Sequence, residues 1–333
     1  MRARFVSRLR GLRKRLKRRH RIERHDARLD GVIGRRARVR TVATGFAFTE
    51  GPVWLPQGHL LFGDLPNNVI RKWDPQAGAS VVRTRSGYAD ADIPPGKAMG
   101  SNGMTLDDQS RLTICEPGNR RVTRIDDDGS VVVLADGYDG KRLNSPNDLV
   151  FRSDGSLYFT DPPHGLMNED DDPTKELDVN GVYLVAGGEV RLVASDMTRP
   201  NGLAFSPDER HLYVSNSDRD AKIWKKYDVA PDGTLGNGRV VLDLTATSGQ
   251  APDGMKVDRD GNLYCTGPGG LWILDPEGAV LGRIKMRPEP SNCAWGDDGA
   301  TLYLTCVDRV CRITTKVPGI RPPLTAPTAA STE

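Results

Sequence analysis

Six short segments of the chain place a carboxylate or an amide side chain directly before an apolar run, and in four of them a glycine follows the polar residue. Carboxylate and amide oxygens are hard ligands that suit Ca²⁺, Mg²⁺ or Mn²⁺. The set contains no Cys or His, which argues against a dedicated zinc site. The six residues are spaced by 52, 45, 54, 52 and 39 positions and are Glu50, Asn102, Asn147, Asn201, Asp253 and Asn292.

A second interpretation of these segments needs no ligand. Asn-Gly and Asp-Gly pairs form tight turns, and each pair here could simply precede a strand. One copy alone would be explained in that way. Six copies in the same register favour a metal site, as does Glu50, which precedes Gly51 at a place where no turn requires a carboxylate.

The elements that must position these side chains form a repeat. Self-similarity at 40–50 residues is typical of a propeller or a solenoid. The copy that begins at Asn201 predicts four strands, over 203–206, 211–216, 222–229 and 239–244. Four antiparallel strands make one propeller blade, so six repeats predict an all-β fold, a six-bladed β-propeller. Each polar residue opens the innermost strand of its blade, and the six side chains should therefore converge on one mouth of the central channel.

The ring also has to close. The last repeat supplies strands over 292–295, 301–305 and 310–314 and lacks a fourth. Residues 39–43, just before the first repeat, can supply it. Pairing of 39–43 with 310–314 would join the two ends of the chain and remove the exposed edges.

Charge is distributed unevenly along the chain. The net charge is +3, but residues 1–40 hold 17 Lys and Arg against 3 Asp and Glu, which leaves 30 against 41 for the remainder. The acidic body argues against a nucleic-acid partner for the propeller. No run of 18 apolar residues is present, which excludes a membrane-spanning helix. The five cysteines have no CxxC or zinc spacing, so we expect reduced thiols in a cytoplasmic protein.

The two ends of the chain lie outside the repeats. Phe5, Leu9, Leu12 and Leu16 fall at helical spacing among many Arg and Lys residues, the pattern of a basic amphipathic helix. Residues 1–23 could therefore contact an anionic membrane surface or a nucleic acid, or they could form a disordered, solvated extension. The sequence thus predicts a basic extension over 1–23, a propeller over 24–315 and a disordered Pro/Thr/Ala-rich tail over 316–333.

Five motifs, in order, resemble the SMP-30/gluconolactonase/LRE-like family over roughly residues 24–315. The motifs are Phe48-Thr-Glu-Gly-Pro-Val-Trp, Ser145-Pro-Asn-Asp-Leu-Val-Phe, Phe159-Thr-Asp-Pro-Pro-His-Gly, Arg199-Pro-Asn-Gly-Leu-Ala-Phe-Ser-Pro-Asp and Ala251-Pro-Asp-Gly-Met. The resemblance implies a six-bladed propeller with one catalytic divalent cation. The cation we expect is Ca²⁺, with Mg²⁺, Mn²⁺ or Zn²⁺ as alternatives.

The resemblance also assigns roles to individual residues. It makes Glu50, Asn201 and Asp253 metal ligands, with Asn147 as a further ligand or a substrate contact. Asp253 matches the family's proposed acid–base residue, and Asn102 would lie beside the metal ligands and contact substrate. The vertebrate-type branch has an Arg where this chain has Ser145, so the chain looks like the microbial gluconolactonase branch.

That microbial branch usually has Tyr-Gly where this chain has His164-Gly165. The connection over 161–180 that carries His164 is long and acidic, and it should lie on the same face as the metal. His164 could therefore contact substrate or transfer a proton, or it could be a surface residue without a role in the site. The function that follows is a divalent-metal-dependent hydrolase of a sugar lactone. The alternatives are a lactonase or esterase of non-sugar substrates, and a calcium-binding propeller without catalysis. The sequence does not predict an oligomeric state.

Overall fold

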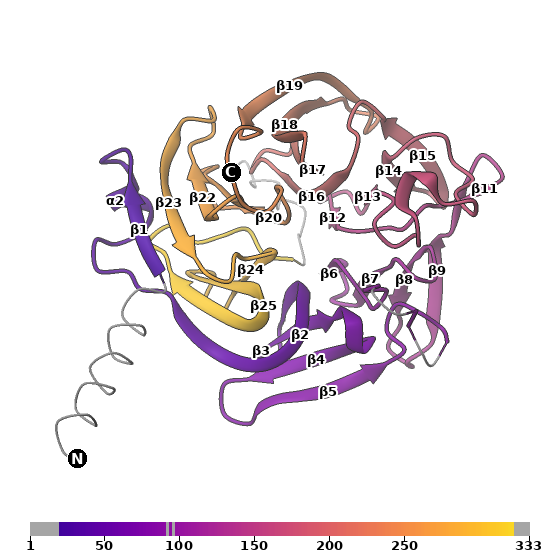
Figure 1. Cartoon of the computed structure of the whole chain (residues 1–333), viewed down its shortest axis with the longest axis horizontal. Coiled ribbons are helices and arrows are strands. Elements are labelled where there is room, and N and C mark those ends of the chain that lie inside the picture. Colours follow the sequence, from indigo (N-terminus) through magenta and orange to yellow (C-terminus); the bar gives the residue numbers. More distant parts are fainter. Residues whose placement is uncertain (1–19, 91–92, 95–96, 323–333) are drawn as a thin grey trace, which may run out of the picture.

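The computed structural model describes residues 20–90, 93–94 and 97–322. These residues form an all-β propeller whose sheets are arranged radially around a central axis (Figure 1). Among the described residues, no helix is both long and apolar enough to cross a membrane. All five cysteines are buried and none forms a disulfide.

Three of the sheets have four antiparallel strands each, in chain order from the axis outward. The first consists of β6 (Met104–Leu106), β7 (Leu112–Glu116), β8 (Arg121–Ile125) and β9 (Val131–Ala135). The second consists of β12 (Leu149–Phe151), β13 (Leu157–Asp161), β14 (Gly181–Ala186) and β15 (Glu189–Ala194). The third consists of β16 (Pro200–Phe205), β17 (His211–Asp218), β18 (Ala221–Val229) and β19 (Leu235–Asp243), which is the four-stranded unit predicted from the repeat at Asn201.

Two sheets are larger. A five-stranded sheet contains β20 (Met255–Val257), β21 (Leu263–Gly267), β22 (Gly270–Leu274), β23 (Val280–Met286) and β1 (His20–Arg24). A six-stranded sheet has the order β24 (Asn292–Gly296), β25 (Thr301–Thr314), β2 (Arg40–Leu55), β3 (His59–Asp64), β4 (Val69–Asp74) and β5 (Gly78–Thr84). The described residues therefore form five sheets of four or more strands, where the sequence predicted six separate blades.

Smaller elements lie in the connections between these strands. They are the hairpin of β10 (Gly137–Tyr138) and β11 (Lys141–Arg142), the short helix α2 (Leu29–Val32), and the 3₁₀ turns η1 (Leu65–Asn67) and η2 (Glu169–Asp171).

The long strands β2 and β25 join the two ends of the chain. Arg40 pairs with Arg312, Thr41 with Cys311 and Ala43 with Val310, which confirms the predicted closure. After an irregularity between Thr44 and Thr49, β2 continues and pairs with β3. The strand β2 thus connects β25, near the end of the chain, with β3 within the six-stranded sheet.

The hydrophobic core lies between neighbouring sheets. Strand residues alternate in direction, so each sheet presents an apolar face to the sheet on either side. Tyr158 of β13 meets Phe205 of β16 edge-on, with ring centroids 5.1 Å apart. Tyr264 of β21 meets Trp295 of β24 edge-on at 4.9 Å. These contacts hold the inner strands in fixed positions around the axis.

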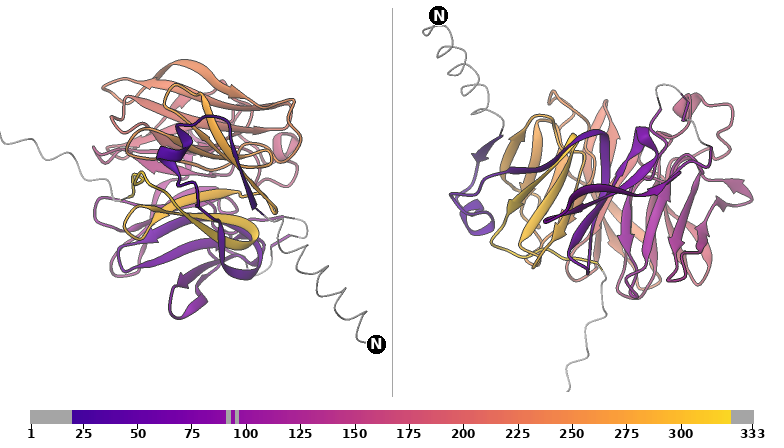
Figure 2. Two further views of the ribbon diagram at one scale, coloured as in Figure 1. Left: turned by 90° about the vertical axis from the view of Figure 1, so that its left-hand side faces the viewer. Right: turned by 90° about the horizontal axis from the view of Figure 1, so that it is seen from below.

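Both predicted boundaries of the propeller need correction. His20–Arg24 forms β1, which pairs with β23 at the outer edge of its sheet, as Figures 1 and 2 show. Glu23 of this strand forms ion pairs with Arg283 and Lys285, and Ile22 packs against the core. The strand was missed because a single apolar residue, Ile22, among four polar or charged ones gives no apolar alternation, and the pairing depends on the free edge of β23. Residues 1–19, which carry the predicted amphipathic helix, lie outside the described residues.

The first part of the predicted tail also belongs to the folded body. Lys316 donates its backbone N–H to Val32, and Ile320 donates its own to Val257. Gly319 forms a β-bridge with Asp258, and Ile320 packs against the core. The backbone groups of this segment are therefore satisfied by the propeller. Residues 323–333, the rest of the tail, lie outside the described residues.

Candidate metal centre at one mouth of the channel

Five of the six polar residues singled out in the sequence lie at or near the start of an innermost strand, and Glu50 lies within β2 just after its irregularity between Thr44 and Thr49. Hydrogen bonds connect these strands around the axis: Gly103 N–H donates to Asn147 O (2.7 Å), Thr160 Oγ1 to Asn201 O (2.8 Å) and Ser215 Oγ to Asp253 O (2.7 Å). Gly254 N–H donates to Ser291 O (2.8 Å), and Ser291 Oγ donates to Thr49 O (2.8 Å). The strand starts are therefore held in one ring. Of the six side chains, Asp253 is half-buried and the other five are buried, namely Glu50, Asn102, Asn147, Asn201 and Asn292.

The glycines of the motif are explained by close approach between neighbouring strands. A Cβ added at Gly202 would overlap the backbone oxygen of Asp253, and one added at Gly254 would overlap the side chain of Asn292. Neither glycine has a positive φ. The glycines of these Asn-Gly and Asp-Gly pairs thus allow neighbouring strands to pack closely, and they are not required by a turn.

The third repeat has a carboxylate where these glycines stand. Asp148 follows Asn147, is 2% exposed, and accepts a hydrogen bond from Asn292 Nδ2 to its Oδ2 (3.2 Å). We did not single out this residue from the sequence. The signal that could have found it is the departure of one repeat from the Asn-Gly pattern. Glu50, Asp148 and Asp253, with Asn201 and Asn292, form a cluster that we call the acidic centre.

The carboxylates of the acidic centre repel one another when they are ionised. Burial and the neighbouring charge of Asp148 together raise the pKa of Glu50 to about 7, although the hydrogen bond from Gly51 N–H lowers it. Burial, then the charge of Glu50, raises the pKa of Asp253 well above its usual range. Burial also raises the pKa of Asp148, and the charge of Lys256 opposes that shift. Three carboxylates that each resist ionisation are favourable surroundings for a cation.

A buried oxygen atom of Asn201 also indicates that the acidic centre binds a cation. The side chain of Asn201 forms a hydrogen bond with the Asp253 carboxylate, while its buried Oδ1 has no hydrogen-bond partner among the described residues. Buried polar atoms in folded proteins are almost always paired. Among the described residues no three His, Cys, Asp or Glu side chains could hold a metal by themselves, so a site here requires amide oxygens. The Oδ1 of Asn201 fits that requirement.

His164 belongs to a separate polar cluster beside the acidic centre. Its Nε2 lies 2.7 Å from Ser217 Oγ, and its Nδ1 lies 3.9 Å from Glu169 Oε1. Arg199, two residues before Asn201, forms an ion pair with Glu169. Hydrogen bonding from His164, together with Arg199, lowers the pKa of Glu169 to about 2. His164 thus contacts Ser217 near the end of β17, and Glu169 links it to Arg199, which directly precedes β16.

The acidic connection over 161–180 is anchored at several points. Asp161 accepts backbone N–H groups from Asn144 and Ser145, both at 2.7 Å. Ser145 Oγ donates to Pro162 O, and Lys97 Nζ donates to Leu166 O at 2.7 Å. Ser145, which stands where the vertebrate-type branch has Arg, therefore holds the start of this connection in place.

Comparison with known proteins identifies the family. A model described as the SMP-30/gluconolactonase/LRE-like region matches residues 48–308. The chain belongs to this family. A gluconolactonase from Zymomonas mobilis is 41% identical over 90% of this chain and 87% of its own length. Regucalcin from Oryctolagus cuniculus is 29% identical over 77% of this chain and 82% of its own.

Solved structures of family members share the architecture. A gluconolactonase from Xanthomonas campestris superimposes with a TM-score of 0.76 and 31% identity, over 88% of this chain and 94% of that one. A calcium-binding regucalcin from Agrobacterium tumefaciens has a TM-score of 0.67 with 17% identity, over 87% and 98%. That second likeness concerns the fold alone.

Within this family member the predicted site residues divide into three groups. Glu50, Asn201 and Asp253 lie together in the acidic centre. Asn102 and Asn147 lie in the same ring of strand starts and contribute backbone contacts to it, with the N–H of Asn102 bonded to Cys115 O. The third group is His164, in the adjoining cluster.

Proposed function

We propose that this protein is a gluconolactonase-like hydrolase that opens a sugar lactone. The observation that carries the proposal is the 41% identity to a gluconolactonase over most of both chains. The acidic centre at one mouth of the channel supplies a site for the chemistry. The substrate would be a small lactone, and we propose no nucleic-acid partner for the acidic propeller.

We propose that the acidic centre holds one divalent cation through Glu50, Asn147, Asn201 and Asp253. Ca²⁺ is the preferred ion because hard carboxylate and amide oxygens make up the site, and Mg²⁺, Mn²⁺ or Zn²⁺ are alternatives. When bound, such a cation polarises the lactone carbonyl and stabilises negative charge on its oxygen. The orphaned Oδ1 of Asn201 and the raised pKa of Glu50 support this assignment.

Asp253 is our candidate for the residue that moves the proton. It is half-buried, unlike the other two carboxylates, and so has access to the mouth of the channel. Burial raises its pKa, which brings a carboxyl group closer to the pH at which it can both accept and release a proton. The hydrogen bond with Asn201 holds the carboxylate in place.

Substrate hydroxyls would be bound by the polar side chains around the mouth, Asn102, Asn147 and His164. The ring of His164 is oriented by Ser217 on one side and by Glu169 on the other. Because the side chain is 29% exposed, a hydroxyl group at the mouth can still reach it.

The test is turnover of sugar lactones by the purified full chain. Hydrolysis of glucono-δ-lactone is measured with Ca²⁺, Mg²⁺, Mn²⁺ or Zn²⁺ and after chelation, beside an aliphatic lactone and an organophosphate ester. We expect sugar lactones to be hydrolysed fastest and chelation to abolish turnover. Faster turnover of the aliphatic lactone or the phosphate ester would assign the enzyme to non-sugar substrates. Tight Ca²⁺ binding without turnover of any lactone would favour the alternative of a calcium-binding propeller.

We also propose that the propeller has six blades. The six-stranded sheet then consists of two blades. Residues 40–44 of β2 form the outer strand of the blade that contains β24 and β25, and residues 49–55 form the inner strand of the blade that contains β3, β4 and β5. The irregularity between Thr44 and Thr49, and the positive φ of Val307 in β25, fall where the two blades would meet. A cytoplasmic location and a weak membrane contact through the basic N-terminus are likewise proposals.

A further inference from the structure

A pocket of about 420 Å³ occupies the end of the central channel away from the acidic centre. All six innermost strands line it, each with residues that follow its polar first residue: Val53, Thr105, Phe151, Phe205, Val257 and Trp295 are examples. None of the six polar residues of the ring is in the lining. The channel therefore has a polar half and an apolar half, and we call the second the apolar pocket.

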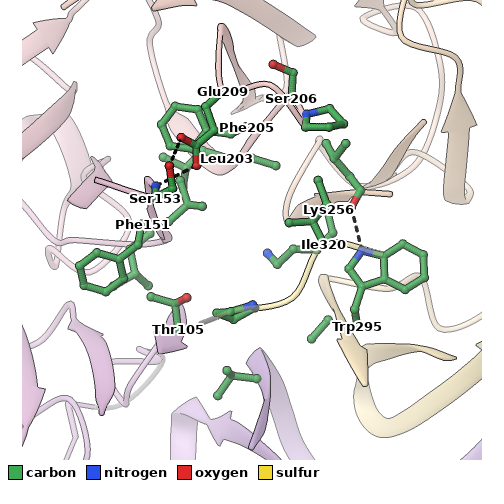
Figure 3. Close-up of a pocket in the computed structure, with 18 of the residues that line it drawn as sticks. Thr105, Phe151, Ser153, Leu203, Phe205, Ser206, Glu209, Lys256, Trp295 and Ile320 are labelled. Carbon is green, nitrogen blue, oxygen red and sulfur yellow. Dashed lines mark hydrogen bonds between the residues drawn. The ribbon is translucent and has the colours of Figure 1, made fainter. Parts of the chain in front are cut away.

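Figure 3 shows the composition of the apolar pocket. Aromatic and aliphatic side chains surround it, among them Phe151, Leu203, Phe205 and Ile320. Trp295 is held in place by its Nε1–H, which donates to Val257 O at 3.0 Å. Pockets of about 300–1,000 Å³ with mostly apolar walls and few polar groups are typical small-molecule sites.

Two basic residues line this pocket, Lys256 of β20 and the exposed Arg259. The Nζ of Lys256 donates to the carbonyl oxygen of Met255 at 2.9 Å. The residue is half-buried. Met255 stands two residues after Asp253, so this hydrogen bond places the ammonium group of Lys256 toward the inner end of the pocket, near the acidic centre.

The acidic groups at the outer rim are engaged elsewhere. The Glu209 carboxylate accepts hydrogen bonds from the backbone N–H and the Oγ of Ser153, at 2.8 and 2.6 Å. Asp208 accepts one from Ser206 Oγ at 2.6 Å. An entering ligand would therefore meet apolar walls with a positive charge at the inner end.

We propose that the apolar pocket binds an aliphatic carboxylate of medium chain length. The carboxylate would pair with Lys256, and the hydrocarbon chain would lie among the aromatic and aliphatic side chains. Apolar walls select against sugars and their lactones, so this site is distinct from the proposed lactonase site. A charge-assisted hydrogen bond to Lys256 selects a carboxylate over an alcohol of the same length.

The experiment is calorimetric titration of the full chain, saturated with Ca²⁺, with hexanoate, octanoate and octanol. Octanoate should bind about 15-fold more tightly than hexanoate, because each buried methylene contributes about fourfold. Octanoate should also bind at least about tenfold more tightly than octanol, because its carboxylate gains a hydrogen bond to a charged group. Equal affinity for octanol and octanoate, or no saturable binding, would overturn the proposal.

Two variants locate the site. Lys256→Met keeps the length of the side chain and should remove the preference for octanoate over octanol. Lys141→Met removes a lysine from the exposed hairpin strand β11 and should change nothing. The competing occupant is the chain's own segment 323–333, which follows Pro322 in the pocket wall. If octanoate binds only after that segment is deleted, the segment fills the pocket and the proposal is wrong.

Discussion

Replacing Glu50 by Gln should stabilise the protein without its cation and weaken cation binding at the same time. Glu50 is 3% exposed, and burial raises its pKa from 4.5 to about 7. The folded-state pKa is the higher one, so the stability that the protonated carboxyl contributes is lost as the pH rises through about 7. At pH 8 the wild type carries the full cost of this buried charge, and a Gln side chain carries none.

The size of the effect follows from that shift. A difference of about 2.5 pKa units corresponds to about 3 kcal/mol of unfolding free energy as an upper bound. For a chain of this length, that amounts to a rise in Tm of about 5 °C. The amide oxygen of the Glu50→Gln side chain can still accept the hydrogen bond that Gly51 N–H donates to Glu50, so packing should be conserved. With Ca²⁺ in excess the order should reverse, because the wild type binds the cation more tightly and gains more from it.

The assay is thermal unfolding at pH 8 with a chelator and with excess Ca²⁺, together with calorimetric Ca²⁺ titration. The exposed Glu189→Gln variant, at the start of β15, is the matched control and should follow the wild type in both conditions. If Glu50→Gln lowers Tm by the same amount with and without Ca²⁺, Glu50 is a structural hydrogen-bond acceptor and the acidic centre stores no repulsion at this position.

Three further predictions concern other parts of the molecule. Asp253→Asn should stay on the order of 10²–10⁴-fold below wild-type turnover even at saturating cation, because its proton carrier is gone; full rescue by cation would make Asp253 a ligand only and His164 the better candidate for proton transfer. Burial raises the pKa of Asp161 from 3.8 to about 7, so wild-type stability should fall as the pH rises from about 4 to 7, and Asp161→Asn should flatten that dependence in chemical denaturation. Deletion of residues 1–19 should leave Tm and lactonase rate nearly unchanged, whereas deletion through residue 24 should lower Tm because it removes β1.

Repetition made most of the fold predictable from the sequence. Six copies of one motif, each with a polar residue before an apolar run, indicate the inner strands and the mouth at which the polar side chains meet. What the repeat could not predict lies where a copy or a terminus departs from it. Asp148 occupies a glycine position, and its contact with Asn292 depends on how strands far apart in the sequence are placed around the axis. The pairing of β1 and the packing of 316–322 depend in the same way on edges and surfaces that local sequence does not reveal.

The ring of strand starts explains why the acidic centre can keep its repulsion. Carboxylates on flexible loops would move apart or turn toward water. Here hydrogen bonds of Ser291 and Ser215 join the chain segments that carry Glu50 and Asp253 to their neighbours. The glycines let these segments pack so closely that the carboxylates cannot move apart. A site held rigid in this way is already arranged for a positive charge before one arrives, which is the condition under which fixed charges assist binding and catalysis most. The same rigidity maintains the apolar pocket, because its walls are the continuations of the same six strands.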